Sequence, residues 1–524
     1  LMNPITHDNL GKAYDATQAE SEYRGLQARI KEAIMNTGAV MANVSKSGLQ
    51  VTVDVPSRLD QVTPLTRVKD SELTDPIDSI PSLTCRLTLK SPESVQDVKV
   101  SISAGLPVIA VPDTVCYPSV SSIPIDHDIC FYMKTKHVPS SLNVRVCATY
   151  SYAANGVTRV TETRIRLPFK LVAKSGQLQA KFEQEQSSAP DNGPNMSSAS
   201  KAQLKKVTFD TNKPCVQLVE LFPEFAGTFA SVGSNVIAIQ YYGNAQVNVT
   251  IQGAKSGANR YRIQSETYES IWLVAQEFVA RLKEHFRKLS QELSITCQEA
   301  LPIDDFRQQI DKHLELRLRL EHYGQMLEQN CVQFRAVEKR LLTKLKDKSP
   351  TSLDSMDALL DATYRRILSV SDNYLNCQQE LSIASNALNN MSNLYVLLLS
   401  LAYKLSKEDV EILNGIMSFR IPDTPELGWE ESINVAVTNL MRTALSRGKE
   451  TSSSQQQQPQ LQLKMPTDSS KLEKQIKSLV SKFDSGATLI SSVYLKRGKL
   501  EIFLDPLIRI FGSIFIRNIN TFVT

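Results

Sequence analysis

The stretch RYRIQSETYESIWLVAQEFVARLKEHF, residues 260–286, changes its hydrophobic period partway along. Up to Ser265 it alternates like a strand, with Tyr261 and Ile263 on one face. Beyond Ser265 the apolar residues follow helical spacing and share one stripe: Tyr268, Ile271, Trp272, Ala275, Phe278, Val279, Leu282 and Phe286. We expect Ser265 to cap this helix, because serine is a favoured N-cap residue and acidic residues follow in the first turn. A stripe this wide predicts a sheet beneath the helix.

The residues before this stretch supply that sheet. KVTF at 206–209 is typical of a strand, and VQLVELF at 216–222 is typical of a short helix. NVIAIQYY and AQVNVTIQ are typical of two more strands. Residues 205–290 are therefore predicted to form a small α/β platform, with the amphipathic helix lying across one face of the sheet.

Residues 39–173 alternate apolar and polar residues with a period of two. Leu83, Cys85, Leu87 and Leu89 are one such set, and the last set runs through residues 165–171. About seven strands of this kind, each with one dry and one wet face, predict an antiparallel β-sandwich. Residues 12–38 form a predicted helical coiled-coil segment before it, and residues 174–204 have the composition of a linker.

Residues 302–406 keep apolar residues at alternating spacings of three and four, which predicts two long helices. The break KDKSP at 346–350 predicts that they fold back as an antiparallel hairpin. We expect the second arm to break again near 386–393, which is rich in asparagine. The seam of this hairpin is also a candidate subunit interface, and its main residues are Leu320, Leu327, Phe334, Leu341, Leu360, Ile367, Tyr374, Leu381 and Leu388.

The chain continues with predicted C-terminal helices at 407–448, a low-complexity linker at 449–468 and a short helix at 469–485. Residues 486–524 form an apolar tail that is interrupted by charges and Pro506, and its pattern predicts no definite structure. The predicted fold class is thus multidomain α+β. It combines an adaptin-ear-like antiparallel sandwich, an α/β platform, a long helical hairpin and C-terminal helices.

Composition argues against several function classes. A net charge of +4 over 524 residues is too small to predict nucleic-acid binding. The eight cysteines include no CxxC pair, and no run of 18 apolar residues occurs, so we expect a cytosolic protein without a structural zinc site. His127 between Asp126 and Asp128 could form a metal or acid–base cluster, but a surface strand or turn is the favoured interpretation. We therefore expect neither an enzyme nor a cofactor.

The helix CVQFRAVEKRLLTKLKDK, residues 331–348, carries the clearest charge signal. Its basic residues flank the apolar stripe and are candidate contacts for anionic lipid or an acidic partner: Arg335, Lys339, Arg340, Lys344 and Lys346. The alternative is that they are solvated flanks of a packed helix, and this alternative is favoured because only one arm of the hairpin is basic.

The order of sandwich, platform and helical extension is similar to the ear appendages of clathrin adaptors, with long helices added. Several motifs resemble the parathyroid hormone-responsive B1 family, also called the Bardet-Biedl syndrome protein 9 family. They are VTFDTNKPCVQLVELFPEFA at 207–226, RYRIQSETYESIWL, VQFRAVEKRLLTKLKDKSP, MDALLDATY at 356–364 and ELGWEES at 426–432. The resemblance runs from about residue 15 to about residue 445, and its motifs keep their order and spacing.

This resemblance implies a core subunit of the BBSome, a coat-like complex that carries membrane proteins to and from cilia. It implies other BBSome subunits as partners and a location in the cytoplasm, the cilium and the ciliary base. Contact with membrane cargo and anionic membrane would come through the assembled complex. In that family a β-propeller precedes the 12–38 segment, so this chain resembles a C-terminal portion. The leading hypothesis is a non-enzymatic scaffold, and the alternative is an ear-type module that binds peptides.

Overall fold

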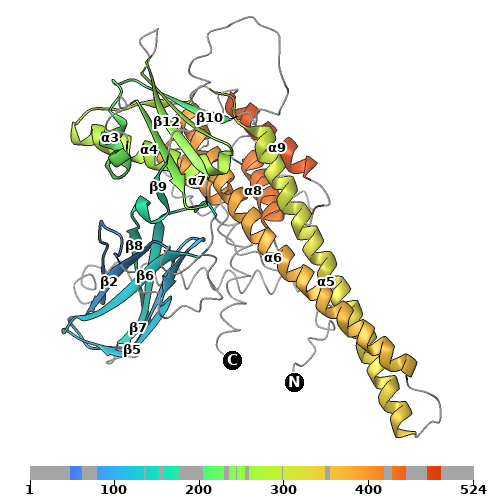
Figure 1. Ribbon diagram of the computed structural model, residues 1–524. Coiled ribbons are helices and arrows are strands. Elements are labelled where there is room, and N and C mark those ends of the chain that lie inside the picture. The colour runs from blue at the N-terminus through green and yellow to red at the C-terminus, as the bar shows by residue number, and fades with distance from the viewer. Residues whose placement is uncertain are drawn as a thin grey trace, which may run out of the picture.

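Figure 1 shows the computed structural model of the chain as a body of sheets and helices from which a long helical hairpin projects. The structure describes residues 48–61, 80–134, 137–152, 158–176, 204–228, 235–243, 245–253, 259–297, 299–347, 354–417, 428–443, 466 and 469–484. The predicted segment at 12–38 and the tail at 486–524 lie outside the described residues, as does most of both linkers.

Two four-stranded antiparallel sheets form the sandwich, and its described part has eight strands where the sequence predicts about seven. The first sheet has the order β1 (Gln50–Asp54), β2 (Ser82–Lys90), β6 (Ile125–Met133), β4 (Val108–Val111). The second has the order β5 (Thr114–Val120), β3 (Val95–Ser103), β7 (Asn143–Tyr152), β8 (Thr158–Arg166). The alternating apolar residues of β2, from Leu83 to Leu89, are fully buried between the sheets.

The last strand of the sandwich ends earlier than its pattern predicts. β8 stops at Arg166, and residues Phe169–Leu171 form a 3-10 turn, η4, in place of the expected strand. Pro168 precedes this turn, and because proline has no N–H it cannot continue a strand ladder. The chain then enters β9 (Ala173–Ser175), which pairs with the platform sheet.

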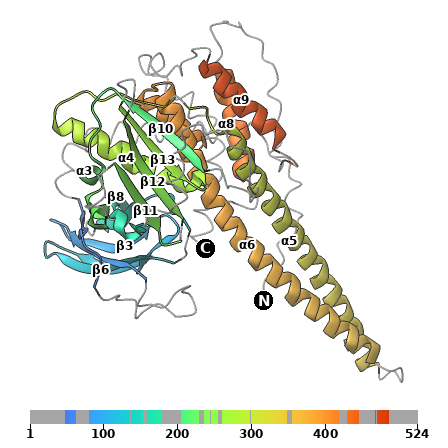
Figure 2. The ribbon, with the colours of Figure 1, turned by 45° about the horizontal axis from the view of Figure 1, so that its top comes forward.

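The platform is a six-stranded antiparallel sheet covered on one face by the helix α4 (Tyr268–Lys288), as Figure 2 shows. Its order is β14 (Ile295–Thr296), β10 (Lys205–Thr211), β13 (Asn259–Ser265), β12 (Gln246–Gly253), β11 (Val236–Tyr241), β9. A short helix, α3 (Leu218–Leu221), and the 3-10 turn η5 (Pro223–Thr228) connect β10 to β11. Phe278 of α4 packs on Phe209 and Tyr261, with ring centroids 5.8 and 4.8 Å away. The strand-to-helix switch in the sequence is therefore confirmed.

The helix α4 begins two residues later than predicted. Ser265 remains in β13, where its hydroxyl donates to the Gln246 carbonyl at 2.8 Å. The N-cap is Thr267, whose backbone is extended and whose hydroxyl lies 2.8 Å from the Ser270 hydroxyl. Sheet pairing thus takes Ser265 away from the helix.

The hairpin consists of α5 (Ile303–Lys346) and α6 (Asp354–Ala402), which run antiparallel over most of their length. At 44 residues, α5 extends over about 66 Å. The predicted break at 386–393 is wrong, because α6 is continuous through this segment. The asparagine amides there have partners outside the ladder: Asn386 and Asn390 donate to the Val138 carbonyl, at 2.6 and 3.2 Å.

A C-terminal bundle of α7 (Lys407–Met417), α8 (Trp429–Thr443) and α9 (Ser470–Asp484) packs against the base of the hairpin. Its core joins apolar residues of all three helices to Phe306 of α5 and Tyr395 of α6. Phe306 stacks on Tyr395 at 5.0 Å and meets Trp429 edge-on at 6.3 Å.

Sandwich, platform and hairpin base form one body with a continuous core. Leu394, Leu398 and Leu401 of α6 belong to the same buried cluster as the sheets. Trp272 of α4 donates to the Ser140 carbonyl of the sandwich at 2.8 Å, and Arg166 at the end of β8 pairs with the buried Glu277 of α4. The hairpin is therefore anchored at its base and projects from a single body.

Candidate interaction surface on the hairpin

The predicted seam lies between the two arms of the hairpin. Its nine residues recur every seven positions and are all half-buried or buried in the structure. The ring centroids of Phe334 and Tyr364 lie 6.3 Å apart across the hairpin. Gly324 also faces the other arm, because a Cβ added to it would lie 3.8 Å from the ring of Tyr374. Leu381 and Leu388 are buried near the base. The hairpin thus uses the seam for its own packing, and contact between the seam and another subunit stays a prediction.

Five of the large apolar side chains that the hairpin leaves exposed form a different set, and four others, Leu318, Val332, Leu359 and Ile383, lie on the back or on the other flank of their helices. We call it the outer strip, and its members each expose 48–53% of their surface: Leu342, Leu345, Tyr364, Leu368 and Leu375. Each follows a seam residue by one or four positions, as Leu368 follows Ile367 and Tyr364 follows Leu360. In a heptad these two positions share one flank of the helix. The strip is therefore an ordered feature of one side of the rod.

Contacts across the hairpin show that matching flanks of the two arms lie together. On the strip side, His313 Nε2 of α5 lies 3.0 Å from the Ser385 hydroxyl of α6, which is four residues after Leu381. On the opposite side, Arg319 and Glu380 each precede a seam residue by one position and form an ion pair at 3.7 Å. The rod thus has two distinct long faces.

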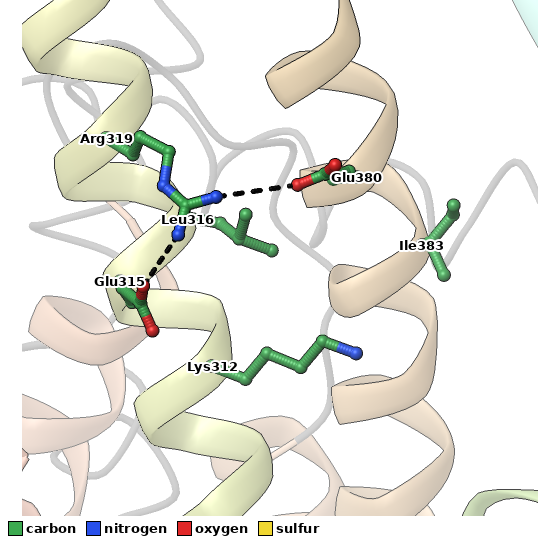
Figure 3. Close-up of a pocket in the computed structure, with 6 residues that line it drawn as sticks. All are labelled: Lys312, Glu315, Leu316, Arg319, Glu380 and Ile383. Atoms are coloured by element: carbon green, nitrogen blue, oxygen red, sulfur yellow. Dashed lines mark hydrogen bonds and ion pairs between the residues drawn. The ribbon is translucent and has the colours of Figure 1, made fainter.

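A pocket of about 310 Å³ opens on this opposite face, near the base (Figure 3). Leu316 and Ile383 supply its apolar lining, and Lys312, Glu315, Arg319 and Glu380 supply its charged lining. Figure 3 shows Arg319 held between Glu315, at 2.6 Å, and Glu380, while Lys312 extends from α5 toward α6. Its ion pairs are exposed and therefore contribute little to stability.

A buried polar cluster attaches α8 to the base of the hairpin. His313 Nδ1 lies 2.6 Å from Glu430 Oε1, and Arg317 Nη1 lies 2.5 Å from Glu430 Oε2. Arg317 also pairs with Glu431 through two nitrogens, at 2.8 and 3.2 Å. The glutamate side chains are at most 5% exposed and the Arg317 side chain is 12% exposed. These pairs therefore act in a setting where solvent screens them weakly.

The electrostatics of the cluster favour its charged form. Burial alone would raise the pKa of the Glu430 carboxyl, but the hydrogen bond from His313 and the charge of Arg317 hold that pKa below its ordinary value. Burial would lower the pKa of Arg317, but its bonds to Glu431 and the charges of both glutamates raise it. A Cβ on Gly428 would lie 2.0 Å from the Arg317 guanidinium carbon, so glycine leaves the room that this arginine needs.

The basic residues predicted near the hairpin tip do not form one patch. Lys344 is half-buried at a seam position, whereas Arg335, Lys339, Arg340 and Lys346 are exposed. Their heptad positions distribute them around α5, with Arg335 on the strip side, Arg340 on the opposite side and Lys339 on the back. None of the five forms an ion pair with another described residue. This arrangement agrees better with solvated flanks than with a single lipid-binding patch.

Comparison with known families shows the same domains in the same order. Models of the PTHB1 GAE domain, platform domain, hairpin and C-terminal helix bundle match residues 78–165, 195–299, 300–403 and 405–483. The chain belongs to the PTHB1 family. This confirms the resemblance drawn from the motifs, and the α+β fold class with an ear-like domain is confirmed as well.

Similar PTHB1 proteins come from several vertebrates. Protein PTHB1 of Mus musculus is 32% identical over 483 residues, which is 91% of this chain and 51% of the mouse protein. Protein PTHB1 of Homo sapiens is 31% identical with the same coverage, and that of Xenopus laevis is 32% identical over 89% of this chain and 52% of its own. The chain thus spans about half the length of the curated relatives it matches. A solved FixG-related protein from Vibrio parahaemolyticus covers 23% of this chain and 96% of its own at 11% identity, but its TM-score of 0.15 is too low to inform the fold.

Asp126, His127 and Asp128 do not converge on one site in the structure. They lie in β6, where alternation points His127 to one face and both aspartates to the other. Asp126 accepts from Thr88 at 2.7 Å, Asp128 pairs with Arg86 at 3.6 Å, and His127 meets Tyr117 edge-on. Within the described ranges, no three His, Cys, Asp or Glu residues are arranged to hold a metal ion. In the same ranges, no helix combines the length and the apolar character needed to cross a membrane.

The polar cluster and the outer strip were not predicted from the sequence. The cluster joins His313 to Glu430, which are 117 residues apart in the chain, and a local sequence pattern cannot predict such a contact. The strip had a readable signal, because Leu368 and Leu375 stand directly after seam residues. An apolar residue beside a seam is more than the hairpin itself requires.

Proposed function

We propose that the chain is a non-enzymatic structural subunit of the BBSome that scaffolds assembly of this complex and thereby supports trafficking of membrane proteins to and from the cilium. The observation that carries the proposal is the presence of four PTHB1 regions, in order, on a chain whose hairpin projects with exposed apolar residues. Exposed apolar surface of this kind marks interaction sites.

The architecture suits a scaffold physically. The sandwich, platform and bundle share buried contacts with the hairpin base, so the rod has a fixed direction relative to the body. Beyond Arg317 the rod projects over about 43 Å, so it can reach subunits that do not touch the body. Because both long faces of the rod differ, each can select a different partner.

The proposed partners are the other BBSome subunits, and contact with membrane cargo and anionic membrane belongs to the assembled complex. The proposed location is the cytoplasm, the cilium and the ciliary base. No cofactor is part of this proposal.

A shortened hairpin tests the proposal directly. Because Gly324 faces Tyr374 across the hairpin, joining these residues by a short glycine-rich turn removes residues 325–373 and keeps the base. We expect the shortened chain to keep its body, measured by hydrogen exchange of the sheets, and to lose BBSome subunits when co-expressed with them. Retention of every subunit would contradict the scaffold proposal. Retention that is then abolished by substitutions in the sandwich would favour the ear-type peptide-binding module.

A further inference from the structure

The outer strip continues a face of the hairpin that already binds a helix. Arg317 stands four residues after the seam residue His313, so it lies on the strip side of α5. There it holds Glu430 and Glu431 in the first turn of α8. Beyond Arg317 toward the tip, this side carries the outer strip and remains exposed. The helix-binding face is therefore longer than the helix that the chain places on it.

The uncovered part of this face is also acidic. At the same one-residue and four-residue positions stand the exposed acids Glu321, Glu328, Glu338, Asp357 and Asp361, against a single base, Arg335. Asp361 pairs with Arg365 at 2.8 Å, whereas Glu328, Glu338 and Asp357 form no ion pair with described residues. On the opposite side, the corresponding distal positions hold Arg340 and Arg366 against a single exposed acid, Asp347 at the end of α5. The two faces thus differ in the sign of their charge.

The length of the strip sets the size of its occupant. Tyr364 and Leu375 are 11 residues apart on α6, which is about 16 Å. Phe334 of α5 contacts Tyr364, so it marks the same height on the rod. From there Leu345 lies 11 residues farther toward the tip, which adds about another 16 Å to the length of the strip. A single helix of about 22 residues would cover the whole strip.

We propose that the outer strip binds one amphipathic α-helix of another protein, with apolar residues spaced by three and four and with lysine or arginine beside them. The occupant is a protein because the acids would repel the anionic headgroups of a membrane. It is a different chain because a second copy would bring the same acids together. The inference rests on the proposed function only in taking that protein to be a BBSome subunit.

The first experiment uses the full chain, co-expressed with the BBSome subunits and purified by a tag on this chain. The test variants are Leu368→Glu/Leu375→Glu, which places charge in the strip, and Glu328→Lys/Glu338→Lys, which reverses the charge beside it. The matched control is Val332→Glu, because Val332 is 60% exposed but stands on the back of α5. We expect each test variant to retain about tenfold less of at least one subunit, and the control to retain all of them.

A photo-reactive residue at position 368 identifies the occupant. We expect cross-links to one helical segment that carries basic residues beside its apolar stripe. Cross-links to lipid, to a second copy of the chain or to a β-structured segment would overturn the inference, as would unchanged retention in both test variants. None of these outcomes would contradict the proposed function, because the unmodified chain would still co-purify with the BBSome subunits.

A second experiment does not depend on BBSome subunits. A labelled 22-residue helix of leucine and lysine, designed with this spacing, is titrated with the full chain and compared with a leucine–glutamate version. We expect binding of the lysine version only, weakened about tenfold by Leu368→Glu/Leu375→Glu and unchanged by Val332→Glu. Equal binding to all three chains would overturn the inference. Binding of the peptide by a chain that recruits no subunit would support the inference and contradict the proposed function.

Discussion

Arg317 ties the start of α8 to the hairpin, because its guanidinium pairs with two buried glutamates. Replacing it with alanine takes the arginine away from two buried carboxylates, of which only Glu430 has His313 beside it. We expect Arg317→Ala to lower the free energy of local opening of α8 by about 3–5 kcal/mol. Hydrogen exchange of the α8 amides measures this quantity.

The matched control is Arg319→Ala, which removes an exposed arginine from the same helix. Its ion pairs are solvated, so the expected loss is only about 0–1 kcal/mol. Equal protection of α8 in the two variants would show that the buried cluster does not hold the helix.

Gly428 tests the same cluster from its other side. A Cβ at this position would overlap the Arg317 guanidinium, which its partners fix in place. We expect Gly428→Ala to destabilise the docking of α8 by about 1–3 kcal/mol. In an Arg317→Ala background the same substitution should cost much less, because the overlapping group is absent. Additive losses, measured by hydrogen exchange, would contradict the overlap.

The pH dependence of α8 docking follows from Glu430. Its pKa in the folded chain is lowered from the ordinary value of 4.5, so its charged form contributes stability above that value. This stability is lost as pH falls through the lowered pKa. We expect the protection of α8 to decrease on acidification below about pH 4.5 more steeply in the wild type than in Glu430→Gln, which does not titrate. If the protection of α8 fell equally with pH in the two proteins, titration of Glu430 would not account for the pH dependence of docking.

At the residue scale, sequence alone predicts stripes and misses tertiary pairs. Phe278 and Trp272 were predicted on the covered face of α4 because their spacing is periodic, and both are buried. The clustering of Arg317 with Glu431 depends on how α8 docks, which is decided by packing of the whole bundle. Glu430 and Glu431 by themselves indicate only the start of a helix.

At the scale of elements, α5 places the basic residues of its distal half around its circumference. A dispersed set offers no flat surface where several positive charges meet lipid headgroups together. We expect the complex with Arg335→Gln/Lys339→Gln/Arg340→Gln/Lys344→Gln to float with phosphatidylserine-containing liposomes as the wild-type complex does. A clear loss of flotation would assign these residues to the membrane and contradict the interpretation as solvated flanks.

The elements also show which boundaries a pattern can predict. The switch of period in residues 260–286 predicts both β13 and α4, and only the cap is displaced, from Ser265 to Thr267. The continuity of α6 through Asn386 and Asn390 was not predictable. Asparagine favours breaks when its amide has no better partner, and here the partner is the Val138 carbonyl of another domain.

At the scale of the whole molecule, the chain consists of one body and one rod. The body buries the sheets and the bundle, whereas the distal rod keeps apolar side chains in contact with solvent. The order of domains was predictable because each has its own period and composition. Which faces stay uncovered was not predicted, since that depends on where α8 ends its contact with the hairpin.

The mass of the complex isolated around the full chain tests the central claim most directly. The chain is co-expressed with the BBSome subunits, purified by its own tag and measured by native mass spectrometry. We predict a hetero-oligomer that contains this chain and several different subunits. A stable, solitary monomer that leaves every one of those subunits behind would contradict the account.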